Sequence, residues 1–132
     1  QAAIKYMAIK NYGRIVNMSS YSGRTASIVT GPPYAAAKGG IIALTRRLAL
    51  EVGSKGITVN AVAPGTILSG ARMIALWDEL SEKQKEDVLA SIPLGRLSTA
   101  EEQAKVVMFL LSDGADYITG AVIDVNGGRL MA

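Results

Sequence analysis

The sequence predicts an α/β fold with a doubly wound, mainly parallel sheet of about three strands. Three runs rich in β-branched residues, at 14–19, 57–63 and 120–126, are separated by longer segments with helical character. Strands that alternate with helices of ten or more residues are typical of βαβ units, in which the strands run parallel. Because the runs are apolar at most positions, we expect helices to cover both faces of the sheet.

The first helices are predicted from apolar spacing and from the residues at their ends. Residues 2–11 are expected to form the end of a helix that stops at Gly13. Residues 20–33, rich in Ser, Thr, Gly and Pro, are expected to form a loop. From 34 to about 53, apolar residues recur every three or four positions, which predicts an amphipathic helix.

Three more helices are predicted in the second half of the chain. Two short ones are expected near 70–78 and 81–91, the second capped by Ser81. Thr99 is expected to cap a longer helix that runs to about Leu111. Four residues of this last helix are expected to face the sheet: Ala104, Val107, Met108 and Leu111.

Composition excludes several kinds of chemistry. The 132 residues include no Cys and no His, about half are apolar and 19% are charged, which is typical of one globular domain. Without Cys there are no disulfides, thiolate nucleophiles or Cys-based metal sites. Without His there is no Ser-His-Asp triad. Catalysis must therefore rest on Ser, Thr, Tyr, Lys, Asp or Glu, and the composition fits a cytoplasmic protein.

Charge is distributed unevenly along the chain. Residues 1–60 have a balance of +7, and residues 61–132 have a balance of −4, for a sum of +3. A nucleic-acid module is one interpretation of the basic half, but its cations are dispersed and aromatic residues are few. A solvated face, or attraction to an anionic cofactor or partner, is favoured instead.

The amino end begins with Gln1 and continues directly in helical sequence without a capping signal. This start is not typical of a signal peptide, and no apolar run approaches the ~18 residues that would span a membrane. An uncapped helical start indicates a cut through a longer protein.

The most informative pair is Tyr34 and Lys38, four residues apart and therefore on one face of a helix. A free phenol, with a pKa of about 10, is a poor acid or base at neutral pH. A nearby ammonium favours the phenolate and lowers that pKa. The pair is thus a candidate acid–base group in a chain without His. The alternative is an ordinary helix start with a packed tyrosine and a solvated lysine.

Two further features follow predicted strands. Ser19 and Ser20 end the first strand, and Pro64-Gly65 ends the second, followed by residues 66–69. The carboxyl ends of parallel strands are where α/β sheets bind ligands. A hydroxyl could bind a substrate oxygen there, and Pro-Gly could bring the backbone close to a ligand. Each feature alone could be a cap or a turn, but all three fall at the same predicted edge.

These residues and several short motifs resemble the classical branch of the short-chain dehydrogenase/reductase family, most closely its 3-oxoacyl-[acyl-carrier-protein] reductases. The resemblance covers the whole chain and implies a Rossmann-like sheet. It is carried by five segments in order: Gly13-Arg14-Ile15-Val16-Asn17-Met18-Ser19-Ser20-Tyr21-Ser22-Gly23, Tyr34-Ala35-Ala36-Ala37-Lys38-Gly39-Gly40, Ile57-Thr58-Val59-Asn60-Ala61-Val62-Ala63-Pro64-Gly65, Pro93-Leu94-Gly95-Arg96-Leu97, and Tyr117-Ile118-Thr119-Gly120 with Val125-Asn126-Gly127-Gly128.

The resemblance implies roles for individual residues. Ser20, rather than Ser19, aligns with the catalytic serine, Tyr34 with the proton donor and acceptor, and Lys38 with the lysine that holds the nicotinamide ribose. Asn60 aligns with an asparagine that we interpret as structural, and residues 68–92 align with the variable substrate lid. Residues expected to bind the cofactor are Tyr34, Lys38, Pro64, Gly65, Ile67 and Ser69.

The implied activity is reversible hydride transfer between NADP or NAD and a ketone or 3-oxoacyl group, with no metal. The substrate would be a small molecule or an acyl group on a carrier protein, with Lys10 and Lys55 where such reductases place basic docking residues. A sugar or small-alcohol dehydrogenase is an alternative within the family. Homotetramers are common in the family, with helices equivalent to 1–12 and 34–53 at one interface and the last strand at another. No nucleic acid and no membrane are expected.

Three family features are absent from the 132 residues. They are the glycine-rich phosphate loop of the form T-G-x-x-x-G-x-G, the N-N-A-G segment, and the catalytic Asn on the preceding helix. We therefore expect residues 1–132 to be the carboxyl-terminal catalytic half of a Rossmann-like domain, without the cofactor-phosphate half. A non-catalytic fragment that folds only with a partner chain is a second hypothesis.

Overall fold

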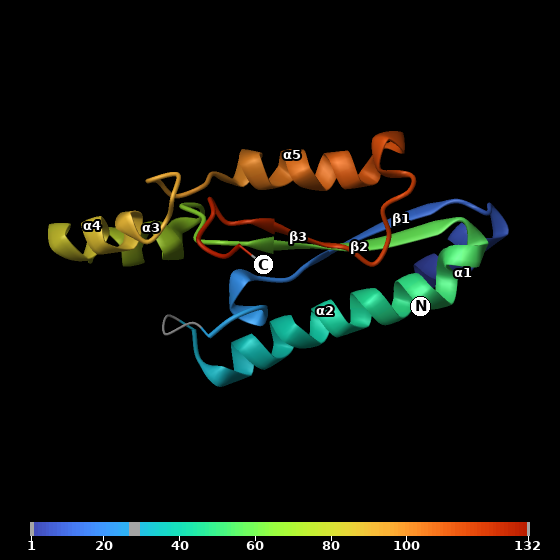
Figure 1. Ribbon diagram of the computed structural model, residues 1–132, viewed down its shortest axis with the longest axis horizontal. Coiled ribbons are helices and arrows are strands. Elements are labelled where there is room, and N and C mark those ends of the chain that lie inside the picture. The colour runs from blue at the N-terminus through green and yellow to red at the C-terminus, as the bar shows by residue number, and fades with distance from the viewer. Residues whose placement is uncertain (1, 27–29, 132) are drawn as a thin grey trace.

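Three parallel strands form the sheet, in the order β1-β2-β3 (Figure 1). They span Gly13–Met18, Ile57–Pro64 and Val122–Val125. This computed structural model describes residues 2–26 and 30–131. The predicted fold class is confirmed, although β3 is shorter than expected. It ends before Asn126, whose side-chain oxygen accepts a hydrogen bond from the Gly128 amide and turns the chain.

β2 is the central strand and is buried along its whole length. Its buried polar residue Asn60 joins it to the segment that leads into β3. The Asn60 amide donates to the Ile118 carbonyl at 2.8 Å and its oxygen accepts from the Ala121 amide at 3.1 Å. Both ends of the side chain are thus satisfied, which is the structural role expected for it.

Helices cover both faces of the sheet, as predicted (Figure 1). α1 (Ala2–Ile9) and α2 (Pro32–Val52) lie on one face, and α5 (Ala100–Leu111) lies on the other. One core cluster joins α2 to β2 through Ala49, Val52, Ile57 and Val59. The second joins the sheet to α5 and to the turn that follows it, through Val62, Leu110 and Ala115.

Two short helices, α3 (Ala71–Asp78) and α4 (Glu82–Ala90), extend beyond the carboxyl end of β2 (Figure 1). The predicted cap of the second is confirmed, because the Ser81 hydroxyl accepts from the Gln84 amide. Single-turn helices complete the fold: η1 (Tyr21–Gly23), η2 (Gly53–Lys55) and η3 (Asp113–Ala115). Residues 27–29 of the predicted loop lie outside the described residues.

α2 begins two residues earlier than predicted. Pro32 and Pro33, which were expected to close the preceding loop, form its first turn. Proline is well suited to that position because the first amides of a helix need no intrahelical partner. Thr45 is buried as part of the apolar stripe, whereas Leu44 is half exposed.

The prediction of which side of α5 faces the sheet was largely wrong. Ala104, Met108 and Leu111 are exposed, and Val107 alone of the four packs on the core. The residues that face the sheet are instead Gln103, Val106, Val107 and Leu110. Because the second half of this helix is apolar on several sides, its spacing could not single out one face.

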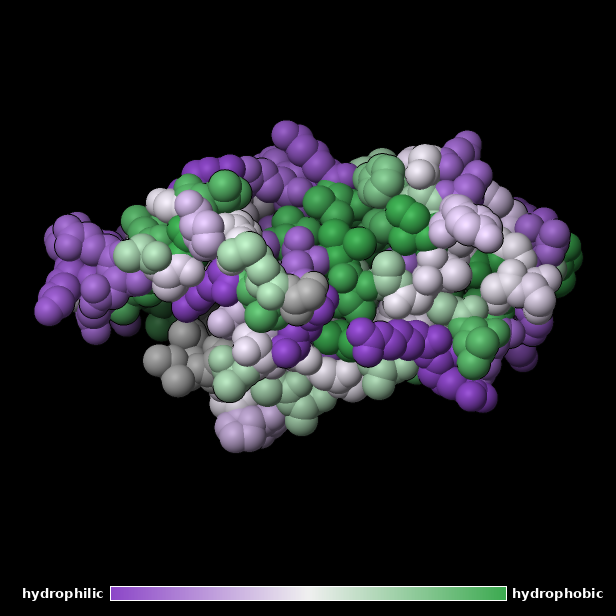
Figure 2. All heavy atoms as spheres, viewed as in Figure 1, coloured by the Kyte–Doolittle hydropathy of each residue, from purple (hydrophilic) through white to green (hydrophobic). Residues whose placement is uncertain are grey.

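Apolar side chains gather on the face shown in Figure 2, in the area between α5 and α2. Large apolar residues are also exposed on the helices, including Ile9 of α1, Leu50 of α2 and Met108 of α5. Among the described residues, none of the helices has the length and apolar character needed to cross a membrane.

Candidate active site

The carboxyl ends of the three strands lie at one edge of the sheet, where α2 also begins (Figure 1). Met18 ends β1, Pro64 ends β2 and Val125 ends β3. The segments that contain Ser20, Tyr34 and residues 65–69 all start from this edge. The structure therefore brings the three sequence features together, as parallel strands require.

Ser19 and Ser20 have different environments. Ser19 is buried, and its hydroxyl donates to the Lys38 main-chain carbonyl at 2.8 Å. Ser20 is partly exposed and caps η1, where its side-chain oxygen accepts from the Ser22 amide at 3.2 Å. The hydroxyl hydrogen of Ser20 is not needed for that bond, so this residue can donate to a ligand.

The turn after Ser20 packs tightly against α2. A Cβ added to Gly23 would lie 2.7 Å from the carbonyl carbon of Lys38 and 2.8 Å from the amide nitrogen of Gly39. Such distances are shorter than real Cβ contacts and the opposing atoms are backbone. Glycine at this position therefore allows the serine turn to approach the helix that carries Tyr34 and Lys38.

Tyr34 and Lys38 share one face of α2, as predicted. The Lys38 ammonium lies 5.6 Å from the centre of the Tyr34 ring, and it donates a hydrogen bond to the Met18 carbonyl at 2.9 Å. The Tyr34 side chain is 45% exposed at the surface. A fixed cation thus lies beside an accessible phenol, at the end of β1.

The segment after β2 contains the remaining predicted residues. Pro64 is buried, Gly65 and Ile67 are partly buried, and Ser69 is exposed. The Gly65 amide donates to the Val125 carbonyl at 3.1 Å, and a Cβ on Gly65 would lie 3.0 Å from Asn126. This segment is thus held closely against the end of β3.

An open groove of about 460 Å³ borders this segment, between the end of β1 and α5. Met18, Ile67, Ser69 and Gln103 are among its lining residues. Gln103 is 4% exposed, and its amide nitrogen donates to Ser98 and to the Val125 carbonyl. Its side-chain oxygen is buried and has no hydrogen-bond partner among the described residues.

A second groove of about 300 Å³ lies between α3, α4 and the segments after β2 and β3. Its lining is mainly apolar, with Arg129 and Thr66 as the polar members. The Arg129 guanidinium also lies 5.3 Å from the centre of the Tyr21 ring, next to Ser20. The apolar residues that line the groove are Leu68, Met73, Leu76, Trp77, Leu80, Val88 and Leu97.

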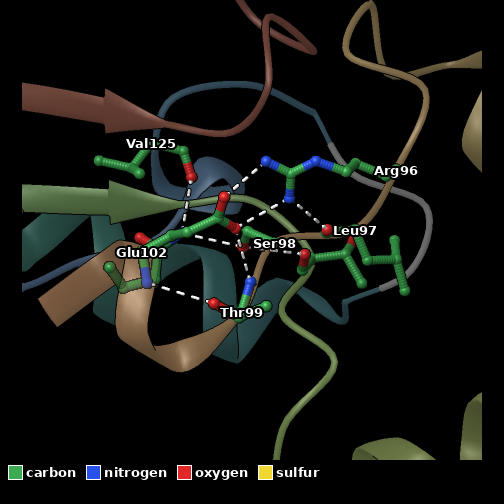
Figure 3. A network of polar contacts seen from close by, with 8 residues as sticks. Arg96, Leu97, Ser98, Thr99, Glu102 and Val125 are labelled. Atoms are coloured by element: carbon green, nitrogen blue, oxygen red, sulfur yellow. Dashed lines mark hydrogen bonds and ion pairs between the residues drawn. The ribbon is translucent and has the colours of Figure 1, made fainter. Parts of the chain in front are cut away.

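A polar network fixes the segment between this groove and α5 (Figure 3). The Arg96 guanidinium points toward Glu102 and donates to both carboxylate oxygens, at 2.9 and 2.5 Å. The Thr99 amide donates to the same carboxylate and completes the predicted cap of α5. The hydrogen bond from Arg96, followed by that from Thr99, lowers the pKa of Glu102 to about 2.

Sequence reasoning assigned no individual role to Arg24, Gln103 or Arg129, although all three contact the predicted site region. Their partners are distant in the sequence, so no local pattern indicates them. Within residues 2–26 and 30–131 no acidic cluster suited to a metal ion occurs.

Comparison with known proteins agrees with this geometry. The model of the family described as "Enoyl-(Acyl carrier protein) reductase" matches residues 1–129. The chain therefore belongs to that family, within the short-chain dehydrogenases/reductases that its motifs resemble.

Curated relatives bear the name 3-oxoacyl-[acyl-carrier-protein] reductase FabG. The protein from Pseudomonas aeruginosa is 50% identical over 132 residues, which are 100% of this chain and 51% of the relative. The protein from Rickettsia felis is 48% identical over 133 residues. The match covers 98% of this chain and 51% of the relative. The chain thus spans about half the length of the curated relatives it matches.

Solved structures are also similar. A 3-oxoacyl-[acyl-carrier protein] reductase from Brucella melitensis has a TM-score of 0.87 and 37% identity, covering 97% of this chain and 46% of the other. A second reductase structure from the same organism, with bound NAD, has a TM-score of 0.81 and 36% identity, covering 97% and 45%.

Proposed function

We propose that residues 1–132 form the catalytic and substrate-binding half of a Rossmann-like domain in an NAD(P)-dependent oxidoreductase. The reaction would interconvert a 3-oxoacyl group and the corresponding secondary alcohol. One observation carries the proposal. The Lys38 ammonium is fixed between the Met18 carbonyl and the Tyr34 ring, at the sheet edge from which Ser20 also projects. This is an acid–base arrangement that requires no histidine.

Each of the three residues has a distinct task in this proposal. Ser20 donates its free hydroxyl hydrogen to the substrate carbonyl oxygen and so orients it. Tyr34 gives its hydroxyl proton to the same oxygen as negative charge develops there, and takes it back in the reverse direction. Lys38 stabilises the negative charge left on the tyrosine oxygen. A bound nicotinamide cofactor supplies or accepts the hydride at the carbonyl carbon.

The residues around the groove beside Ile67 fit the nicotinamide end of such a cofactor, whether NADP or NAD. Gln103 lines this groove, and its side-chain amide is held by Ser98 and by the Val125 carbonyl. Pro64, Gly65, Ile67 and Ser69 would border the ring, while Tyr34 and Lys38 would bind the adjoining ribose. The glycine-rich phosphate loop is not among the 132 residues.

The mainly apolar groove under α3 and α4 favours an acyl chain over a sugar. Burying apolar surface stabilises a complex by roughly 25 cal/mol per Å², whereas a polyol would find only Arg129 and Thr66 as polar side chains there. The groove reaches Arg129, which lies over Tyr21, the neighbour of Ser20. An acyl chain in this groove could therefore present its ketone near the serine.

We propose further that the protein is cytoplasmic, takes its acyl group from an acyl carrier protein and assembles as a homotetramer. The exposed apolar residues Ile9 of α1 and Leu50 of α2 support an interface on these helices, because they are 83% and 78% exposed.

The test is a steady-state assay of the natural polypeptide that carries this sequence. We expect oxidation of NADPH or NADH with 3-oxoacyl thioesters, and a KM that falls as the acyl chain lengthens. Trp77→Ala should raise KM for long chains and leave short ones unchanged. Turnover of sugars or small alcohols alone would support the alternative dehydrogenase and would refute the acyl substrate.

A further inference from the structure

Arg24 joins the turn that begins at Ser20 to the last strand of the sheet. Its guanidinium lies 2.8 Å from the Asp124 carboxylate and also donates to the Val122 carbonyl at 3.3 Å. Both charged side chains are 19% exposed. Ion pairs on open surfaces contribute little, but partial burial strengthens the attraction between the charges and reduces screening by salt. This pair is therefore suited to holding a fixed geometry.

Arg24 is part of the same turn as Ser20. Ser20 is the N-cap of η1 and Arg24 is its C-cap. Between them, the Ser22 amide donates to the Ser20 side-chain oxygen at 3.2 Å, and the Gly23 amide donates to the Ser20 carbonyl at 2.9 Å. A displacement of Arg24 would therefore be transmitted directly to the Ser20 hydroxyl.

The turn is held from its other side by α2. Gly23 lies against the backbone of Lys38 so closely that a methyl group would not fit. The serine turn thus lies between α2, which contains Tyr34 and Lys38, and β3, which contains Asp124. The cation–π contact of Arg129 with Tyr21 is a second link between the turn and the carboxyl-terminal segment.

Asp124 depends on Arg24 for compensation of its charge. One of its carboxylate oxygens is buried and has no hydrogen-bond partner among the described residues. Burial raises the pKa of the Asp124 carboxyl, and the nearby Arg24 opposes that rise. A carboxylate in such a place is tolerated because the cation is fixed beside it.

We propose that Arg24 and Asp124 are positioning residues that hold the Ser20 hydroxyl in place relative to Tyr34 and Lys38. The inference rests on the proposed function, since it assigns a catalytic task to Ser20. It adds a role for two residues that do not touch the substrate and act through the serine turn.

Kinetic measurements on the natural polypeptide test this role with three variants. Arg24→Met removes the cation, and we expect kcat to fall about 10- to 100-fold, since a displacement of ~1 Å can cost that much. KM for the nicotinamide cofactor should change little, because Ser20 is not among its proposed ligands. Arg24→Lys should recover part of kcat. Arg14→Met, which breaks an ion pair with Asp116 at the amino end of β1, is the control and should leave kcat unchanged.

A double variant distinguishes an effect on the position of Ser20 from an effect on the stability of the protein. Arg24→Met alone leaves a buried carboxylate uncompensated and should lower the melting temperature. Arg24→Met combined with Asp124→Leu replaces the pair by apolar side chains and should restore the melting temperature. If the pair positions Ser20, kcat stays low in the double variant. If kcat recovers together with the melting temperature, the pair is merely structural and the proposal is wrong.

Amide hydrogen exchange gives a readout that does not depend on activity. In Arg24→Met the Ser22 and Gly23 amides should exchange at least about tenfold faster, because their acceptors belong to Ser20. The Gln84 amide, bound to the Ser81 hydroxyl in the cap of α4, is the internal control. Unchanged exchange at Ser22 would overturn the proposal. A wild-type protein without reductase activity would instead refute the proposed function, while exchange would still decide whether the pair positions the turn.

Discussion

Ser19 and Lys38 are joined by a hydrogen bond in which the Ser19 hydroxyl donates to the Lys38 main-chain carbonyl oxygen at 2.8 Å. Ser19 directly follows β1, whereas the carbonyl belongs to α2. A second hydrogen bond joins the same two elements, because the Lys38 ammonium donates to the Met18 carbonyl at 2.9 Å. These two hydrogen bonds fix the position of α2 relative to the end of β1. They therefore also fix the position of Tyr34, which is part of α2.

Replacing Ser19 by Ala should weaken this connection. We expect a loss of about 1 kcal/mol in the free energy of unfolding, the usual net contribution of one intramolecular hydrogen bond. A several-fold decrease in kcat should accompany it, because α2 is less firmly placed. Urea denaturation measures the first effect and steady-state kinetics the second. Ser54→Ala, at an exposed position of η2, is the control and should change neither.

Replacing Tyr34 by Phe should nearly abolish turnover. Phenylalanine keeps the aromatic ring beside Lys38 but has no proton to give, so kcat should fall about 10²- to 10⁴-fold. Folding should be unaffected, because the Tyr34 side chain is 45% exposed. Tyr117→Phe removes the same hydroxyl from a fully exposed ring and should retain wild-type kcat. Equal activity in the two variants would exclude Tyr34 as the acid–base residue.

Gly23 and Gly40 form a matched pair for testing the packing of the serine turn. Gly23→Ala places a methyl group 2.7 Å from the Lys38 carbonyl carbon, so the turn must move away from α2. We expect destabilisation of about 1–3 kcal/mol and a decrease in kcat. Gly40→Ala adds the same methyl group inside α2, where nothing lies within 4 Å. It should stabilise the protein by about 0.5–1 kcal/mol. Thermal denaturation of both variants checks the opposite signs.

The sequence predicted the elements better than their contacts. The strands were predictable because β-branched runs such as Ile57-Thr58-Val59 leave few alternatives. The start of α2 was missed because Pro32 and Pro33 were interpreted as loop residues, although proline favours the first turn of a helix. The two prolines could therefore have been used to predict that α2 begins at residue 32.

The candidate site was predictable only where its residues follow a local pattern. Tyr34 and Lys38 share a helix face by spacing alone, and the structure bears this out. The pairing of Arg24 with Asp124 could not be predicted, because it depends on the order of the strands. The burial of Gln103 depends similarly on which side of α5 faces the sheet, and the apolar second half of this helix does not single out one side.

The pair Arg96–Glu102 predicts a defined dependence of stability on pH. Hydrogen bonding to Arg96 holds the pKa of Glu102 at about 2 in the folded protein, below its ordinary value of 4.5. A lowered carboxyl pKa stabilises the fold above about pH 4.5, and this contribution is lost as the pH falls toward 2.

Arg96→Met removes the main cause of the shift. The urea midpoints of wild type and variant should therefore differ at pH 6 and converge between pH 4.5 and 2. Arg96→Lys keeps the charge but cannot form the bidentate hydrogen bonds of arginine. Its urea midpoint at pH 6 should therefore lie between those of wild type and Arg96→Met. A gap between the midpoints that stays constant down to pH 2.5 would show that Glu102 is not the group responsible.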